Sequence, residues 1–181
     1  MLTKINVFAA LAAVITLLLG ALYLIEKTSL RLSANDPQIQ ISEDITNYLS
    51  KGADVENVMP KSTVDVSKSL AWVLITYDDS GLVKSSNAVL NGQTPDLPKG
   101  VLDHARGNGQ NRITWEPQKG VRLAAVITRY DNGYVLVGRS LRDVEERYML
   151  LGKMVGISWV VIILVSYILI FYPPNIRIKR N

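Results

Sequence analysis

Two long runs of apolar residues, one near each end of the chain, dominate its pattern. No charged residue occurs from Ile5 to Ile25 or from Met154 to Ile176. Because roughly 20 apolar residues suffice for a helix to cross a bilayer core, we predict transmembrane helices over 5–25 and 154–172. The first run exceeds the apolar core of a secretory signal and lacks a small-residue cleavage site at its end, which favours an uncleaved anchor over a cleaved signal.

Between these runs, apolar residues alternate with polar ones, and their spacing predicts shorter elements. Apolar residues at Ile41, Ile45, Tyr48 and Leu49 predict a helix that begins at Pro37, with Asp36 as its cap and Gly52 as its stop. Residues 26–69 are therefore expected to form a helical stalk and connector, of which the part from 51 to 69 is polar and has no sustained period.

Five strands are predicted between residues 70 and 140. Leu70–Tyr77 is apolar on both faces, as a strand covered on two sides would be. A short helix is expected over 100–106, and the predicted strands are 70–77, 82–86, 112–116, 121–130 and 134–139. Because short links join these strands, we expect an antiparallel sheet. The predicted fold class is α+β: a PAS-like five-stranded antiparallel sheet with flanking helices, bracketed by two transmembrane helices.

The segment Gly133–Leu151 joins the last predicted strand to the second apolar run without a break. Ser140, with Asp143 three residues later, resembles a capping box, in which the serine oxygen accepts from free N–H groups of a starting helix. Leu141 and Val144 begin an apolar stripe at helical spacing. A juxtamembrane helix is therefore expected over 141–153, and it would link the domain mechanically to the membrane.

The positions of the charges carry more information than the net charge of +4. From Glu26 to Lys153 there are 16 basic and 16 acidic residues, so the whole surplus lies at Lys4 and within the last five residues. Basic residues that flank transmembrane helices are retained in the cytoplasm. We therefore expect a two-pass protein of the plasma membrane with a cytoplasmic tip (1–4), a cytoplasmic tail (173–181) and a central extracytoplasmic domain. The neutral middle argues against a nucleic-acid partner.

Few residues support catalysis or metal binding. The chain has no cysteine, which excludes disulfides and thiol chemistry. His104, the only histidine, follows Asp103, and a surface position on a short helix accounts for it. Asp78 and Asp79 lack the ligand spacing of an EF-hand and are interpreted as turn residues. We predict no enzymatic activity, no metal site and no cofactor.

Several segments together resemble a known family. These are the strand-turn-strand Tyr77–Ser86 and the segments Ala34–Gln40, Thr114–Pro117, Gly120–Arg122 and Gly138–Glu145. They resemble the extracytoplasmic PAS-like (Cache, or PDC) sensor region of bacterial histidine kinases and chemoreceptors, and related two-span membrane proteins. The resemblance does not extend to kinase activity, because no phospho-accepting histidine or ATP-binding domain follows the second apolar run.

The resemblance implies a ligand pocket between the sheet and the segment that covers it, here about 87–109. Arg122 and Arg139 are candidates to bind a carboxylate, and Trp115 is a candidate aromatic wall. Asn87 and His104 in the covering segment are further candidate ligand-binding residues. The alternative is that the arginines pair with surface acids and Trp115 fills the core.

Small residues in the apolar runs are candidates for helix packing. Ala12, Thr16 and Gly20 recur at every fourth position, and Gly152 with Gly156 forms a GxxxG pair. Small residues scattered by chance in membrane helices are the alternative. The expected partners are the lipid bilayer, a second copy or a separate membrane signalling protein, and a small extracytoplasmic ligand.

The sequence thus favours a membrane-anchored extracytoplasmic PAS-like sensor or accessory protein that acts through membrane partners. One alternative is a membrane scaffold or interaction protein that binds no ligand. A less favoured alternative is a truncated input region of a histidine kinase.

Overall fold

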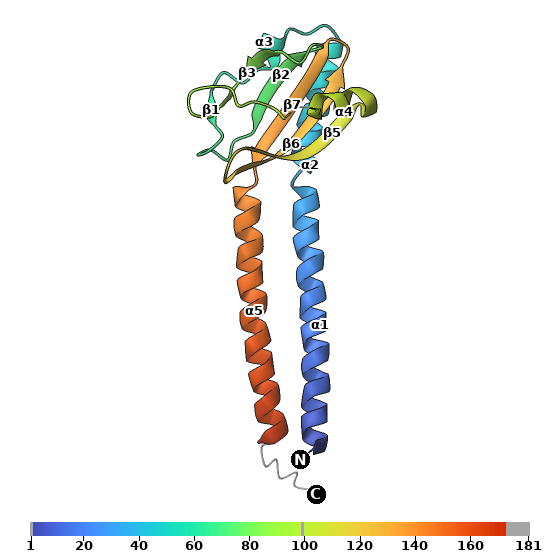
Figure 1. Ribbon diagram of the computed structural model, residues 1–181, viewed down its shortest axis with the longest axis vertical. Helices are drawn as coiled ribbons and strands as arrows, with labels where there is room; N and C mark the ends of the chain where they lie inside the picture. The colour runs from blue at the N-terminus through green and yellow to red at the C-terminus, as the bar shows by residue number, and fades with distance from the viewer. Residues whose placement is uncertain (1, 99, 173–181) are drawn as a thin grey trace, which may run out of the picture. The chain divides into compact units, whose positions relative to one another are not determined.

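The computed structural model describes residues 2–98 and 100–172, which form two compact units. One unit consists of residues 2–30 and 146–172 and is helical, whereas the other, Arg31–Glu145, contains a sheet with helices (Figure 1). The predicted cytoplasmic tail, 173–181, lies outside the described residues.

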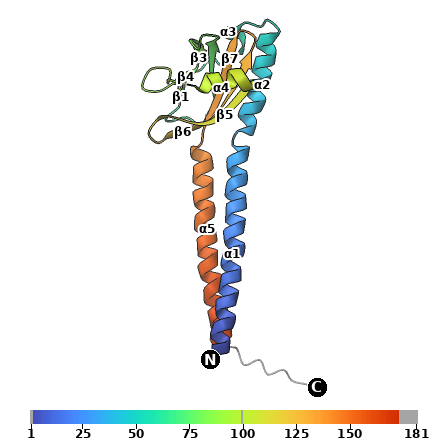
Figure 2. The same ribbon diagram turned by 45° about the vertical axis from the view of Figure 1, so that its right-hand side comes forward.

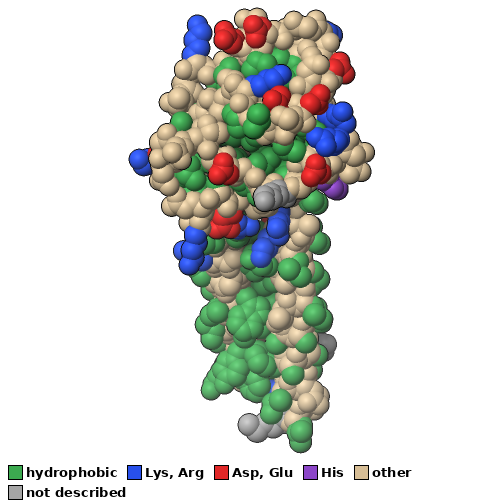
Figure 3. Space-filling model, turned by 45° about the horizontal axis from the view of Figure 1, so that its top comes forward, with side chains coloured by type: hydrophobic (Ala, Val, Ile, Leu, Met, Phe, Trp, Pro, Cys, Tyr) green, Lys and Arg blue, Asp and Glu red, His purple; other side chains and the backbone are tan. Residues whose placement is uncertain are grey.

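The helical unit is built from α1 (Leu2–Ser33) and α5 (Arg142–Phe171), which lie side by side (Figures 1 and 2). The Trp159 indole Nε1 donates to Thr16 Oγ1 at 2.8 Å, and the Phe8 ring packs edge-on against Tyr167 at 5.8 Å between centroids. Neither helix contains a buried residue, and the surface of this unit in Figure 3 is largely apolar. The two predicted apolar helices are confirmed, and both are long and apolar enough to cross a membrane.

The second unit is organised around a five-stranded antiparallel sheet in the order β3-β2-β7-β6-β5. Its strands are β2 (Val73–Asp78), β3 (Val83–Ser86), β5 (Gln110–Gln118), β6 (Val121–Tyr130) and β7 (Gly133–Ser140). The central strand β7 pairs with β2 on one side and with β6 on the other. The predicted α+β class, with a five-stranded antiparallel sheet and flanking helices, is confirmed.

The turn between β2 and β3 is fixed by one side chain. Asp78 Oδ1 accepts from Ser80 N at 2.9 Å, from Ser80 Oγ at 2.6 Å and from Leu82 N at 2.9 Å. These hydrogen bonds, that from the Ser80 hydroxyl foremost, lower the pKa of Asp78 below its ordinary value. Gly81 takes the positive φ of +84° that the turn requires. Asp78 is therefore a turn residue, as its sequence context predicts.

Helices cover both faces of the sheet. Alternate residues along a strand point to opposite faces, so Leu74 and Ile75 belong to two different apolar clusters. On one face α2 (Asp36–Ser50) packs on β6 and β7 through Ile45 and Leu49. On the other face α4 (Val101–Asn108) contributes Ala105 to the larger cluster.

The segment expected to be a polar connector, 51–69, contains two short elements. Asp54 caps α3 (Val55–Val58) by accepting from Glu56 N, and β1 (Val64–Asp65) pairs in parallel with β4 (Ala88–Val89). Elements of two to four residues are too short to produce a hydrophobic period, which is why the sequence pattern did not predict them. Burial of Val64 and Val66 ties this segment to the larger apolar cluster.

Two predicted element boundaries are also shifted. The first strand of the sheet begins at Val73 rather than Leu70, and Leu70 and Trp72 are 38% and 36% exposed. The N-cap of α2 is Asn35 rather than Asp36, and no side chain caps this helix end. The predicted Ser140 contact is present: its Oγ accepts from Arg142 N at 3.3 Å, where α5 begins.

Candidate functional site

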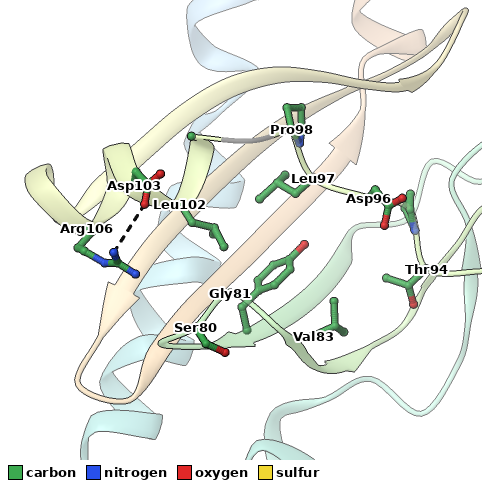
Figure 4. A pocket seen from close by; sticks show the side chains of 13 residues that line it. Ser80, Gly81, Val83, Thr94, Asp96, Leu97, Pro98, Leu102, Asp103 and Arg106 are labelled. Atoms are coloured by element: carbon green, nitrogen blue, oxygen red, sulfur yellow. Dashed lines mark ion pairs between the residues drawn. The ribbon is translucent and has the colours of Figure 1, made fainter.

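A cavity of about 650 Å³ lies between the β2–β3 hairpin and the segment that crosses over this face of the sheet (Figure 4). Its walls come from three places: the hairpin supplies Tyr77 and Val83, the loop before α4 supplies residues 94–98, and α4 supplies Leu102, Asp103 and Arg106. This volume is within the range of small-molecule pockets. The cavity lies under the segment that the sequence analysis expected to cover the sheet.

The cavity is apolar at its centre and polar at two ends. In Figure 4, Leu97 and Leu102 point toward the middle, Asp96 lies on the loop, and Asp103 and Arg106 lie on α4. Such an arrangement suits a ligand with an apolar body and a polar group that fixes its orientation.

Arg106 ties α4 to the sheet and is not available as a free cation. Its Nε donates to Tyr134 Oη at 2.9 Å and its Nη2 donates to the Asp79 carbonyl at 3.0 Å, while Nη1 lies 3.6 Å from Asp103 Oδ1. The bond to Tyr134 is the largest contribution to a raised pKa of Arg106. Arg106 therefore stays charged and holds the α4 wall in place.

Close contact also fixes the hairpin against α4. A Cβ atom at Gly81 would lie 3.1 Å from Leu102 Cδ1, so the turn and the helix touch where glycine stands. Because glycine also adopts the left-handed φ there, this position is restricted for two reasons. The cavity wall at this end is thus preformed.

Tyr77 offers an unused polar group at the cavity. The residue is 3% exposed, and its hydroxyl has no hydrogen-bond partner among the described residues. Burial, with a smaller contribution from the charge of Asp96, raises the pKa of Tyr77 well above its ordinary value. The phenol is therefore neutral at physiological pH, and it can either donate to or accept from a bound molecule.

Asp96 supplies a carboxylate to the same cavity. Its side chain is exposed, and within residues 2–98 and 100–172 it forms none of the observed ion pairs or hydrogen bonds. With Asp103 already next to Arg106, Asp96 leaves the lining with a net negative charge. The site is therefore suited to groups that donate hydrogen bonds, such as amines and hydroxyls, more than to carboxylates.

The residues predicted as ligand-binding from the sequence do not line this cavity. Arg122 forms an ion pair and hydrogen bond with Glu145. Trp115 is 1% exposed within the larger apolar cluster, and its Nε1 has no partner among the described residues. The ion pair of Arg122 and the burial of Trp115 correspond to the alternative described for these two residues.

The other three candidates are also separated from one another. The side chain of Asn87 accepts from Leu74 N at 2.7 Å and donates to the Ser62 carbonyl at 3.5 Å, so it joins β2 to the connector. His104 is exposed on α4, where the Asn108 amide donates to its carbonyl. Arg139 lines a different cavity.

Tyr77, Asp96 and Arg106 line the cavity but were not predicted from the sequence as site residues. Tyr77 lies near the end of the apolar strand β2. Its sequence context does not indicate that its hydroxyl lacks a hydrogen-bond partner among the described residues of the folded chain. A sequence signal did exist for Asp96, which stands in the loop Asn91–Pro98 between two prolines. No group of three or more metal-ligating side chains occurs among the described residues.

The helix-packing candidates fall into two sets within the helical unit. Thr16 accepts a hydrogen bond from Trp159 of the opposite helix and donates one to the Ala12 carbonyl. A Cβ atom at Gly152 would lie 3.5 Å from the Tyr23 ring. A Cβ atom at Gly20 or at Gly156 would have no neighbour within 4 Å, and both glycines line an open groove of about 400 Å³.

No family model, curated protein or solved structure matches this chain.

Proposed function

We propose that this chain is a membrane-anchored PAS-like sensor or accessory protein. Its second unit, Arg31–Glu145, hereafter the α+β unit, binds a small ligand in the cavity between β2, β3 and α4. The single observation that carries the proposal is the unpartnered Tyr77 hydroxyl at a cavity that also contains the Asp96 carboxylate. A buried hydroxyl without a partner is costly, and a ligand that donates or accepts there would remove the cost.

The fold supports the same proposal. A five-stranded antiparallel sheet with flanking helices, and a segment covering a cavity on one face, is the arrangement that a PAS-like sensor region implies. The PAS-like assignment rests on this arrangement and on the sequence resemblance.

The lining suggests the class of ligand. Asp96 and the Tyr77 hydroxyl together favour an amine or a polyol, and Leu97 with Leu102 favours an apolar body beside it. This differs from the carboxylate that Arg122 and Arg139 suggested in the sequence.

Action through membrane partners is the second part of the proposal. The two apolar helices α1 and α5 support anchoring in a bilayer, with both ends of the chain in the cytoplasm and the α+β unit outside. The groove at Gly20 and Gly156 supports contact with another helix, from a second copy or a separate signalling protein.

A scaffold that binds no ligand is the second candidate function. The observation that favours it is the Arg106 network, which closes α4 onto Tyr134 and the Asp79 carbonyl without any ligand. In that case the α+β unit would present a fixed surface to a protein partner.

A thermal-shift screen of the full chain in nanodiscs separates the two functions. Amines, amino acids and polyols are the probes, and a ligand at 100 times its dissociation constant adds about 2.7 kcal/mol to the free energy of unfolding. We expect a hit whose affinity falls in D96N and in Y77F, which removes only the hydroxyl, but not in D44N, an exposed acidic control on α2. A complete absence of hits would favour the scaffold, and hits that D96N and Y77F leave unchanged would contradict binding in this cavity.

A further inference from the structure

A second cavity, of about 270 Å³, lies beside the N-terminus of α2. It is bounded by the first turn of this helix, by the three residues Leu70, Ala71 and Trp72 that precede β2, and by Arg139 near the end of β7. It shares no lining residue with the cavity under α4. Any ligand it holds is therefore recognised by a different set of residues.

Arg139 provides the positive charge of this cavity. Its Nε donates to the Leu70 carbonyl at 3.1 Å, which holds the guanidinium beside the cavity wall. No described aspartate or glutamate forms an ion pair with it. An arginine fixed through Nε and not paired with an acid can present its remaining N–H groups to a carboxylate in a two-point contact.

Gln38 provides the second, independent observation. This residue of the α2 first turn is 2% exposed and lines the cavity, yet its Oε1 has no hydrogen-bond partner among the described residues. A buried amide oxygen without a donor is rare in folded proteins, because such a group loses its hydration without compensation. Its presence here points to a missing donor.

The helix end adds to the positive potential. No side chain caps the N-terminus of α2, and this end of a helix carries a partial positive charge. Asp36 lies in the same turn but is exposed and does not line the cavity. Trp72, Leu70 and Ile41 supply apolar walls.

We propose that this cavity binds a small carboxylic acid that carries a neighbouring hydroxyl or amino group. The carboxylate pairs with the Arg139 guanidinium, the neighbouring group donates a hydrogen bond to Gln38 Oε1, and the short apolar part packs on Trp72. The volume limits the ligand to a few heavy atoms beyond the carboxylate.

The site lies close in the sequence to both long helices, so binding there can affect the segments that lead into them. Gln38 lies five residues after α1 ends, and Arg139 lies three residues before α5 begins. A ligand that bridges these two residues joins the chain segments that lead into both long helices. Its binding therefore alters the restraint on both segments at once.

Ligand-observed NMR titrations of the full chain in nanodiscs test this proposal. The probes are lactate and alanine, with propionate lacking the donor group and lactamide lacking the carboxylate. We expect lactate or alanine to bind, propionate to bind more weakly, and lactamide not to bind. Equal binding of lactamide and lactate, or no binding of either lactate or alanine, would overturn the proposal.

Four variants locate the binding. R139Q should weaken lactate binding about tenfold or more, because it removes a charge-assisted contact. Q38M should lower the affinity for lactate to that for propionate and leave propionate unchanged. A71F, which fills the cavity and keeps both polar residues, should abolish binding. R112Q, a change at an exposed arginine of β5, should leave it unchanged.

Comparison of the variants shows which of the two cavities binds lactate. Lactate binding that persists in D96N but is lost in A71F supports this second site. Loss in D96N with retention in R139Q and A71F would place the carboxylate under α4 and overturn the proposal. Circular dichroism of each variant shows whether a loss of binding reflects loss of the fold.

Discussion

Gly133 is the first residue of β7 and pairs with Asp78 of β2. It has a φ of +150°, and a Cβ atom there would lie 2.0 Å from the Tyr77 carbonyl oxygen. The neighbouring atom belongs to the backbone of a paired strand and cannot turn away as a flexible side chain would. Any side chain at this position must therefore push the central strand β7 away from β2.

We predict that G133A destabilises the α+β unit by about 3 kcal/mol, which is at the upper end of overpacking costs. G120A is the matched control, because Gly120 also has a positive φ of +83° but no atom within 4 Å of its Cβ position. Its expected cost is about 1 kcal/mol from backbone conformation alone. Urea unfolding followed by circular dichroism measures both, and equal costs would contradict the steric explanation.

Arg122 illustrates why single residues were harder to assign from the sequence than the sheet was. An arginine at the start of a strand can bind a ligand or pair with an acid, and the choice depends on what folds next to it. Its partner, Glu145, is separated by 23 residues and belongs to a later helix. No pattern in the sequence near Arg122 predicts its ion pair with Glu145.

At the scale of elements, turn chemistry made the sheet predictable. Asp78 to Gly81 and Asp131-Asn132-Gly133 mark hairpins, and β6 was expected with the bounds it has, Val121–Tyr130. Elements without a period were missed, such as β1 and β4, which consist of two residues each. The family resemblance implied a pocket under the covering segment, and the larger cavity lies there.

The polar residues of this cavity were not predicted. Whether the Tyr77 hydroxyl has a hydrogen-bond partner depends on residues that are distant in the sequence.

The open groove of the helical unit leads to a prediction about association. Gly156 and Gly20 line this groove of about 400 Å³, and neither has a neighbour within 4 Å of its Cβ position. Small residues let a neighbouring helix approach closely in a bilayer, where packing rather than hydrophobicity drives association. If a second copy occupies the groove, a bulky residue at Gly156 should exclude it.

We expect G156L to reduce disulfide crosslinking between two copies of A12C severalfold in membranes. The control is S158L, because Ser158 is exposed on α5 and does not line the groove. Circular dichroism should show unchanged helicity in both variants. Crosslinking of A12C that persists in G156L would show that the groove is not the contact between copies.

The distribution of charge along the chain distinguishes its two ends from its middle. The 16 basic and 16 acidic residues from Glu26 to Lys153 balance, and Figure 3 shows both signs interspersed over the visible face of the α+β unit. The uncompensated basic residues lie beyond the two apolar runs, which is the distribution expected for cytoplasmic flanks.

The absence of cysteine allows a direct test of this topology. Each single-cysteine variant carries one thiol only, so labelling with a membrane-impermeant maleimide reports one position at a time. N132C lies in the exposed turn between β6 and β7, and T3C lies at the start of α1. Neither substitution removes a charged residue, so the basic residues that set the orientation are kept. We expect N132C to be labelled in cells whose cell wall or outer membrane has been permeabilised but whose plasma membrane is intact. We expect T3C to be labelled only after the plasma membrane has also been permeabilised. The reverse pattern would place the α+β unit in the cytoplasm, where its two cavities would meet a different set of small molecules.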